Sequence, residues 1–304
     1  MQKCVSIVVA YFVACASSAP TPPDGGTNAS SDAGALDGGV TNDAGGTSAC
    51  SLAANTSASG TVTSGCNLLV RDTTSCTADR VDAGLSGYWL KFSCRVVLAP
   101  VTVSGVPHVQ LTADSRPDYT SYYFGSGNAC YDATAPTVPN PNVIAAKSIL
   151  MSVPVTPNTT SQTMPGGAVG LALNGVSIFD NEAAPGDDIY TETQTFDTCR
   201  AHPTPNSTYH YHSEPYAISY DDANFIGVMR DGYAVYGRRD VDAGTPTLDV
   251  YGGHTGTTAD SPSTPVYHYH VNLQTSANAG TAGQTNWFIT TGTYRGTPGS
   301  CTGC

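Results

Sequence analysis

The chain has 304 residues, enough for one large or two small domains, and only 12% of them are charged. Gly, Thr, Ser, Pro and Ala dominate, which favours turns and strands over long helices, because Gly and Pro weaken helix interiors. Twenty-four acidic and twelve basic residues give a formal net charge of −12. Phosphates of nucleic acids and anionic lipids repel such a chain, so the composition argues against both as partners.

The first fifteen residues are typical of an export signal. Lys3 supplies a positive start, and residues 5–14 (VSIVVAYFVA) form an apolar run that is too short to span a bilayer. The run ends in residues 12–15 (FVAC), which resemble a bacterial lipobox with Phe at the position where Leu is usual. We therefore predict a cell-surface or periplasm-facing outer-membrane lipoprotein, attached to the membrane only through a lipid at Cys15. Ordinary cleavage and free secretion are the alternative.

Residues 16–49 form a low-complexity segment rich in Asp, Gly and Ala. It contains too few bulky apolar residues to offset the conformational entropy of an ordered chain. We predict a disordered tether that holds the remainder of the protein away from the membrane.

Eight further cysteines follow this tether, an even number that is typical of disulfide-bonded proteins in oxidising compartments. The sequence does not fix their pairing, except that Cys301-Thr-Gly-Cys304 suggests a disulfide clamp on the C-terminus. A redox pair or half of a zinc site is the weaker interpretation, because no second CxxC occurs. The eight are Cys50, Cys66, Cys76, Cys94, Cys130, Cys199, Cys301 and Cys304.

Short apolar runs separated by Gly and Pro predict a mostly β fold, an antiparallel sandwich or barrel-like structure stapled by disulfides. Asn174-Gly175 and Asp231-Gly232 each lie between apolar flanks, which predicts two tight hairpins. No amphipathic helix of any length is evident. We expect an N-terminal β portion over 50–165 and a second domain over 166–304. The predicted strands cover 88–98, 101–109, 149–155, 169–173, 176–179, 225–229, 233–236, 267–273 and 286–291.

Four of the seven histidines occur in two identical Tyr-His-Tyr-His segments, residues 209–212 and 267–270. On a strand, residues i and i+2 share a face, so the two imidazoles of each segment can converge on one metal ion while the tyrosines face the other way. Two further histidines precede the segments by eight and fourteen residues. We therefore predict one transition-metal site, with copper or zinc as the ion, built from both segments. Its ligands would be His202, His210, His212, His254, His268 and His270.

Other polar residues near these segments are weaker candidates. Glu214, two residues after His212, could serve as a ligand or general base, and so could Asp231, although a turn favours Asp for its own backbone hydrogen bonds. His108 beside Pro107 fits a structural or solvated role. The sequence contains no G-x-S-x-G, P-loop, dinucleotide or H-E-x-x-H motif, so nucleophilic and nucleotide-dependent chemistry lack support.

In order along the chain, these motifs resemble the YHYH domain proteins, exported bacterial proteins without an established activity. The resemblance covers about 166–273, with Ala201 where the family usually has Gly before the His-Pro pair. The matching segments are 173–178 (LNGVSI), 197–203 (DTCRAHP), 209–212 (YHYH), 227–237 (GVMRDGYAVYG) and 267–270 (YHYH). The resemblance implies an exported protein and assigns no reaction.

The sequence thus favours metal binding over catalysis, because no general base is clearly marked. A metal-dependent extracellular enzyme is one alternative, expected if three histidines converge beside a roomy cleft, since catalytic sites keep one coordination position open. A second is recognition of carbohydrate or another extracellular polymer by outward-facing tyrosines. A third is a purely structural His–Tyr network.

Overall fold

The structure, a computed structural model, describes residues 49–304 with the exception of Gly186. The predicted signal sequence and nearly all of the predicted tether lie outside this range. The described residues form one compact unit. No helix among them is long and apolar enough to cross a membrane.

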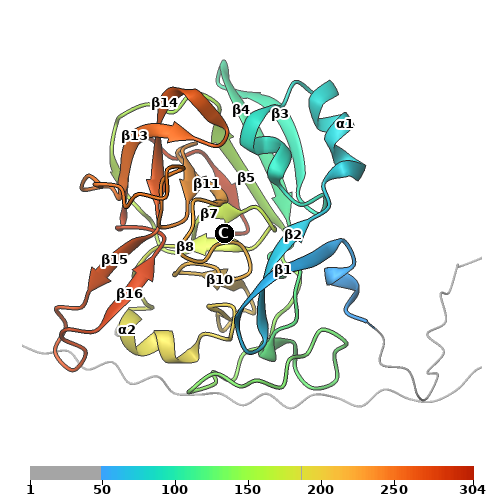
Figure 1. The fold of residues 1–304 in the computed structure, drawn as a ribbon, viewed down its shortest axis with the longest axis vertical. Coiled ribbons are helices and arrows are strands. Elements are labelled where there is room, and N and C mark those ends of the chain that lie inside the picture. The colour runs from blue at the N-terminus through green and yellow to red at the C-terminus, as the bar shows by residue number, and fades with distance from the viewer. Residues whose placement is uncertain (1–48, 186) are drawn as a thin grey trace, which may run out of the picture. The chain divides into compact units, whose positions relative to one another are not determined.

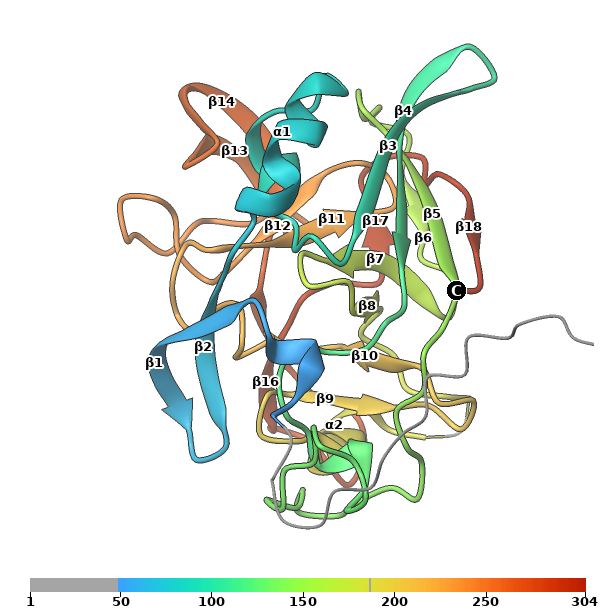
Figure 2. The ribbon, with the colours of Figure 1, turned by 90° about the vertical axis from the view of Figure 1, so that its right-hand side faces the viewer.

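The largest element is an eight-stranded sheet, in which neighbours in space are not always neighbours in the chain (Figures 1 and 2). Its spatial order is β13 (Gly253–Thr258), β14 (Ser261–His270), β12 (Ala234–Tyr236), β11 (Phe225–Met229), β7 (Ala168–Ala172), β8 (Ser177–Phe179), β10 (Tyr209–Tyr211) and β9 (Ala201–Pro203). The sheet confirms the predicted mostly β architecture and contains the two predicted hairpins, β7–β8 and β11–β12.

The sheet is built from two halves that repeat one pattern of strand pairing. In the first half β7 pairs with β8 antiparallel, β8 with β10 parallel, and β10 with β9 antiparallel. In the second half β11, β12, β14 and β13 repeat this sequence of pairings. Both leading hairpins carry a register shift at the same place, between Ala168 and Gly170 and between Phe225 and Gly227. The fold therefore contains an internal structural repeat, joined by the central β7–β11 pair.

A four-stranded sheet and three two-stranded sheets complete the β structure of the described residues (Figures 1 and 2). The four-stranded sheet has the order β18 (Cys301–Thr302), β5 (Ile149–Pro154), β4 (Val106–Ala113) and β3 (Val97–Val103). The pairs are β1 (Thr56–Thr63) with β2 (Cys66–Arg71), β15 (Asn272–Thr275) with β16 (Thr285–Phe288), and β17 (Thr293–Tyr294) with β6 (Gln162–Thr163).

Helices are few and short. The α-helices are α1 (Thr74–Asp82) and α2 (Ile189–Glu192), and the 3-10 helices are η1 (Ser51–Ala53), η2 (Gly87–Lys91), η3 (Tyr122–Phe124) and η4 (Thr193–Thr195). Helix α1 is not predicted from the sequence. Only Arg80 of α1 is buried, so this helix lacks the apolar stripe by which an amphipathic helix is recognised.

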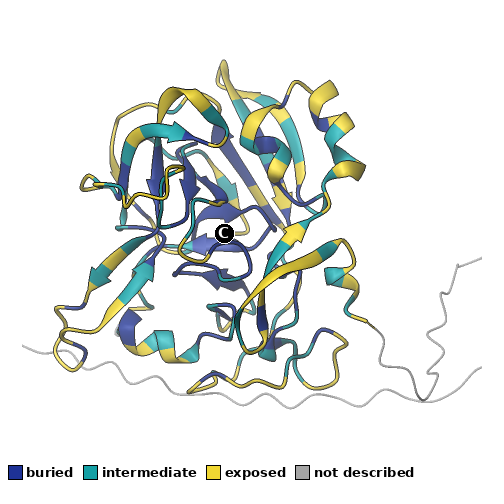
Figure 3. Cartoon of the chain, viewed as in Figure 1, coloured by how far each residue is buried: buried dark blue, intermediate teal, exposed yellow. Residues whose placement is uncertain are grey.

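Both large sheets contribute to one hydrophobic core. Val109 and Met151 from the four-stranded sheet belong to the same buried cluster as Leu171 and Val228 from the eight-stranded sheet. Figure 3 shows the central strands β7 and β11 as buried along their length. The two parts of the chain are thus stabilised by shared burial of apolar surface.

Two strand predictions were wrong. The segment 88–98 begins as the 3-10 helix η2, because Trp89 and Phe92 turn inward together into the core. The segment 101–109 is a hairpin, not one strand: Ser104 and Gly105 both have positive φ and form the turn between β3 and β4.

Four disulfides join the eight cysteines, which confirms the predicted stapling, including the C-terminal clamp. The pairs are Cys50–Cys130, Cys66–Cys199, Cys76–Cys94 and Cys301–Cys304. Cys76–Cys94 fastens α1 to the segment before β3. Cys66–Cys199 connects β2 to the turn that leads into β9.

Candidate metal sites

The six predicted histidines form two clusters, not one. Site 1 contains His202, His210 and His212, and site 2 contains His254, His268 and His270 together with Asp240. The prediction that both YHYH segments share one ion was therefore wrong. The reason is the strand order: five steps, β14-β12-β11-β7-β8-β10, separate the two segments, which is ~24 Å at the usual strand spacing.

The same pairing builds both clusters. In site 1 His202 on β9 lies opposite His210 on β10, and in site 2 His254 on β13 lies opposite His268 on β14. The second histidine of each YHYH segment joins them from the same face, two residues along the strand. Each cluster thus consists of one cross-strand pair plus one i+2 neighbour, and the HxH reasoning is confirmed within each segment.

Hydrogen bonds fix the protons of the site 1 imidazoles. The Nδ1–H of His210 donates to the carbonyl of Thr208 at 3.0 Å, and that of His212 donates to the carbonyl of Asp180. The Thr195 hydroxyl donates to the carbonyl of Glu192, so its oxygen accepts from Nδ1 of His202 at 2.6 Å. A neutral imidazole carries one N–H, so all three Nε2 atoms are unprotonated.

These three Nε2 atoms face one another. The separation is 3.1 Å between His202 and His210 and 2.9 Å between His210 and His212. Without a proton on either nitrogen, neither contact is a hydrogen bond, and the lone pairs repel. An ion bound tetrahedrally at 2.0–2.1 Å would hold such nitrogens about 3.3 Å apart, close to the observed spacing. The arrangement can therefore hold a cation, and hydrogen bonds from Nδ1 are the orienting contacts that metal-ligating histidines use.

Burial keeps these imidazoles in the form that binds metal. All three side chains are buried. Desolvation lowers the pKa of His202 and His210 well below the usual value and lowers the pKa of His212 to about 4. At neutral pH the histidines are uncharged, so an incoming ion has no proton to displace.

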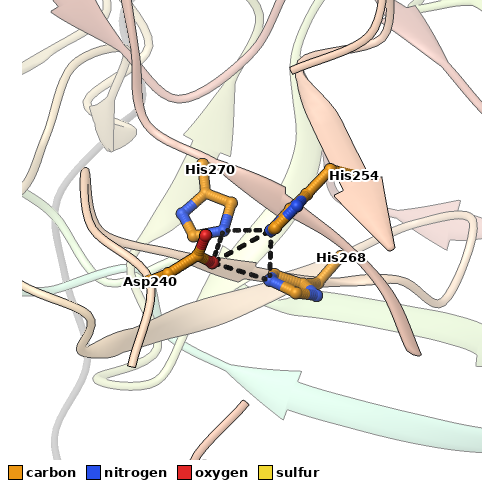
Figure 4. Close-up of side chains that lie close together, drawn as sticks. All are labelled: Asp240, His254, His268 and His270. Atoms are coloured by element: carbon orange, nitrogen blue, oxygen red, sulfur yellow. Dashed lines mark hydrogen bonds and ion pairs between the residues drawn. The ribbon is translucent and has the colours of Figure 1, made fainter. Parts of the chain in front are cut away.

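Site 2 has the same frame and an additional carboxylate (Figure 4). Nε2 of His254 lies 3.2 Å from Nε2 of both His268 and His270. Nδ1 of His268 donates to the carbonyl of Val266 at 2.9 Å, and Nδ1 of His270 donates to that of Gly237 at 2.6 Å. Desolvation again lowers the pKa of His268, and that of His270 to about 4.

Asp240 completes site 2 from the loop after β12. One of its oxygens lies 3.0 Å from Nε2 of His254, 3.4 Å from that of His270 and 3.9 Å from that of His268. Three imidazoles and one carboxylate make a full tetrahedral set. Asp240 is a ligand candidate that the sequence does not predict, because nothing in the local sequence distinguishes it from its acidic neighbours.

The tyrosines of the segments face the opposite side of the sheet, as predicted. Tyr211 accepts a hydrogen bond from Asn174, and Tyr269 donates one to Asp231, so each anchors the turn of its own half. Tyr209, Tyr211 and Tyr269 are almost completely buried. This burial argues against an aromatic binding platform.

Two aspartates in equivalent positions accept hydrogen bonds from the first tyrosine of each YHYH segment. Tyr209 donates to Asp197, and Tyr267 donates to Asp249. Each aspartate stands five residues before the lone histidine of its cluster, in 197–202 (DTCRAH) and 249–254 (DVYGGH). This repeated spacing is visible in the sequence and marks the lone histidine of each cluster.

The remaining candidates occupy structural positions. Glu214 is fully buried and accepts hydrogen bonds from Arg238 and Ser219. Asp231 accepts from Tyr269 and from the backbone of Gly296. In the part of the chain described, neither carboxylate belongs to a histidine cluster. His108 also lies outside both clusters and contacts the carbonyl of Val106.

A cavity of about 720 Å³ adjoins site 1, and His210 and His212 form part of its wall. Asp180 and Glu192 also line it. Desolvation raises the pKa of Asp180 to about 6 and that of Glu192 to about 7. Site 1 thus combines three converging histidines with a roomy acidic space.

Comparison with known proteins agrees with the resemblance seen in the motifs. The model of a family described as YHYH protein matches residues 150–246, so this part of the chain is a YHYH domain. The match includes site 1 and the first YHYH segment, whereas the second segment lies beyond it. No curated protein and no solved structure matches the chain.

Proposed function

We propose that this protein is exported and binds two transition-metal ions, one at each histidine cluster. The observation that carries the proposal is the set of three unprotonated Nε2 atoms in site 1, with 3.1 Å between His202 and His210 and 2.9 Å between His210 and His212. Imidazole nitrogens favour zinc and copper over magnesium or calcium, so one of these two is the expected ion.

A purely structural network is the main competing interpretation. It requires a proton between each pair of facing nitrogens. In site 1 backbone carbonyls and the Thr195 hydroxyl already hold the protons on Nδ1. Protonating a second nitrogen would bury a positive charge, which the lowered pKa values of these histidines oppose. A metal ion also brings positive charge into the site, but direct bonds to all three imidazole lone pairs offset the cost of burying that charge, which a single proton cannot do.

Export is supported from two directions. The first fifteen residues have the features of a signal with a lipobox-like end, and four disulfides are typical of oxidising compartments. We propose a lipid at Cys15 as the attachment to the membrane. Mass spectrometry of the membrane fraction should find the mature protein acylated there, and Cys15→Ala should release it.

Elemental analysis of the purified, tag-free protein tests metal binding. We expect about two equivalents of metal in the wild type, one in His210→Ala, one in His268→Ala and none in the double variant. His108→Ala is the matched control, since this histidine lies outside both clusters, and should retain two equivalents. Equal and near-zero metal in the wild type and the double variant, after incubation with zinc or copper, would remove the proposal.

A further inference from the structure

The two sites differ in what fills the fourth coordination position, and we propose that site 1 is an open, water-activating site whereas site 2 is closed. The inference rests on the proposed metal binding and adds a reaction to it. Site 1 would hydrolyse uncharged or cationic acyl compounds that enter the adjoining cavity, with Glu192 as the general base.

The internal repeat shows why the sites differ. Asp180 and Gly237 are equivalent positions, because each follows the second strand of its hairpin and accepts the Nδ1–H of the last YHYH histidine. Three residues after Gly237 stands Asp240, whose carboxylate completes site 2. Three residues after Asp180 stands Ala183, which has no donor atom and lines the cavity. At the position equivalent to Asp240, site 1 therefore has open cavity space in place of a fourth ligand.

Glu192 is the carboxylate that reaches site 1. It ends α2, and one of its oxygens lies 3.5 Å from Nε2 of His202. Asp240 belongs to the site 2 group, in which all ligand atoms lie within 4.8 Å of one another, whereas Glu192 does not belong to the site 1 group, so its carboxylate does not face all three histidine nitrogens as a fourth ligand would. Its other oxygen is buried without a hydrogen-bond partner among the described residues. A water on the metal would supply that missing donor, and in doing so would place its proton beside a base.

The charge of the cavity selects the substrate. Among the residues that the structure describes, its wall includes five carboxylate side chains and neither Lys nor Arg. Phosphate esters and carboxylated compounds are repelled from such a space, whereas uncharged and cationic molecules are not. The five are Asp180, Glu182, Asp187, Asp188 and Glu192.

The reaction balances with water as the only co-reactant. A metal held by His202, His210 and His212 would polarise a water molecule, and Glu192 would accept a proton from that water while the water oxygen forms a bond to the acyl carbon of the substrate. The bond from that carbon to the leaving group then breaks, and the leaving group takes the proton from Glu192. The products are a carboxylic acid and an alcohol or amine.

Cobalt(II) substitution tests whether the position is open, because visible cobalt bands change when a new ligand binds. His268→Ala isolates site 1, and His210→Ala isolates site 2. Imidazole, an uncharged ligand, should shift the bands of His268→Ala and leave those of His210→Ala unchanged. Adding Asp240→Ala to His210→Ala should open site 2 and restore a response. The inference would be overturned if imidazole left the cobalt bands of His268→Ala unchanged, or if it shifted the bands of His210→Ala by as much.

Hydrolysis of 4-nitrophenyl acetate tests the chemistry. We expect turnover by the zinc-loaded wild type and the His108→Ala control, the buffer rate in His210→Ala, and about a 100-fold loss of kcat/KM in Glu192→Gln. Mono-4-nitrophenyl adipate, an ester whose carboxylate is too distant to attack its own acyl carbon readily, should react at least 10-fold more slowly, and added salt should narrow the difference between the two rates by screening. Turnover that is equal in wild type and Glu192→Gln would refute the role of Glu192.

Metal content separates the outcomes. Glu192→Gln should retain two equivalents; loss of one would make Glu192 a ligand, close site 1 and overturn the inference while leaving metal binding intact. Absence of cobalt bands from both single-site variants would instead refute the proposed function itself.

Discussion

The Cys66–Cys199 disulfide should stabilise the fold more than the Cys76–Cys94 disulfide at α1 does. It should also support metal binding at site 1. It closes a loop with a sequence separation of 133, whereas Cys76–Cys94 closes one of 18. The loss of chain entropy in the unfolded state grows with the logarithm of loop length, which gives about 5 kcal/mol for the long loop and about 3 kcal/mol for the short one.

The long cross-link also holds the turn that leads into β9. The Asp197 carboxylate accepts hydrogen bonds from the backbone N–H of Cys199 at 3.0 Å and of Ala201 at 3.3 Å, and His202 follows directly. Loss of the disulfide frees this turn from β2. Because contacts that orient a ligating histidine contribute roughly 10- to 100-fold to metal affinity, site 1 should weaken by about this factor.

The assay compares two paired variants, Cys66→Ala/Cys199→Ala and Cys76→Ala/Cys94→Ala. Urea unfolding of the metal-free proteins at pH 7 should place the first about 2 kcal/mol below the second. Zinc titration of the same proteins should weaken site 1 in the first variant only and leave site 2 unchanged in both. The reasoning is refuted if the short loop costs as much as the long one, or if both metal sites weaken together.

Three further outcomes are expected. Metal removal by a chelator should lower the free energy of unfolding by about 2.7 kcal/mol per site, compared with protein in free metal at 100 times Kd. The measurement is a fall in Tm of several degrees, and an unchanged Tm would contradict metal binding to the folded state. In the metal-free protein, burial holds the pKa of His212 at about 4 instead of 6.5. Between these two pH values the unfolded chain binds a proton that the folded state excludes, and this favours unfolding. The stability that the neutral His212 contributes is therefore fully present above pH 6.5 and is lost as pH falls through 4. Wild type should therefore lose about 3 kcal/mol relative to His212→Gln between pH 7 and pH 4 in urea unfolding, and a constant difference would show that His212 does not titrate as a buried group. Tyr269→Phe removes the hydroxyl that donates to the buried Asp231 carboxylate, and should cost about 1–3 kcal/mol without changing the metal content of site 2; loss of metal there would assign the tyrosine a different role.

Local chemistry made part of this protein predictable from sequence alone. Asn174-Gly175 and Asp231-Gly232 form the expected tight turns, because only a few residue types adopt positive φ at low cost. The i, i+2 spacing placed both histidines of each YHYH segment on one face, because strand geometry alternates side chains by rule. Cysteine number predicted disulfides without their pairing, since any two of eight thiols can meet only after the chain has folded.

Tertiary structure decided how those pieces combine. The β7–β11 pair joins the two halves at their inner strands, so the YHYH segments lie toward opposite ends of the sheet and form two sites. The path of the chain between the strands decides which carboxylate lies at each cluster. Asp240 lies within site 2, whereas at site 1 Ala183 lines the adjoining cavity and Glu192 lies beside His202. These contacts join residues distant in sequence, and their positions follow from burying one shared core, a condition that no local pattern contains.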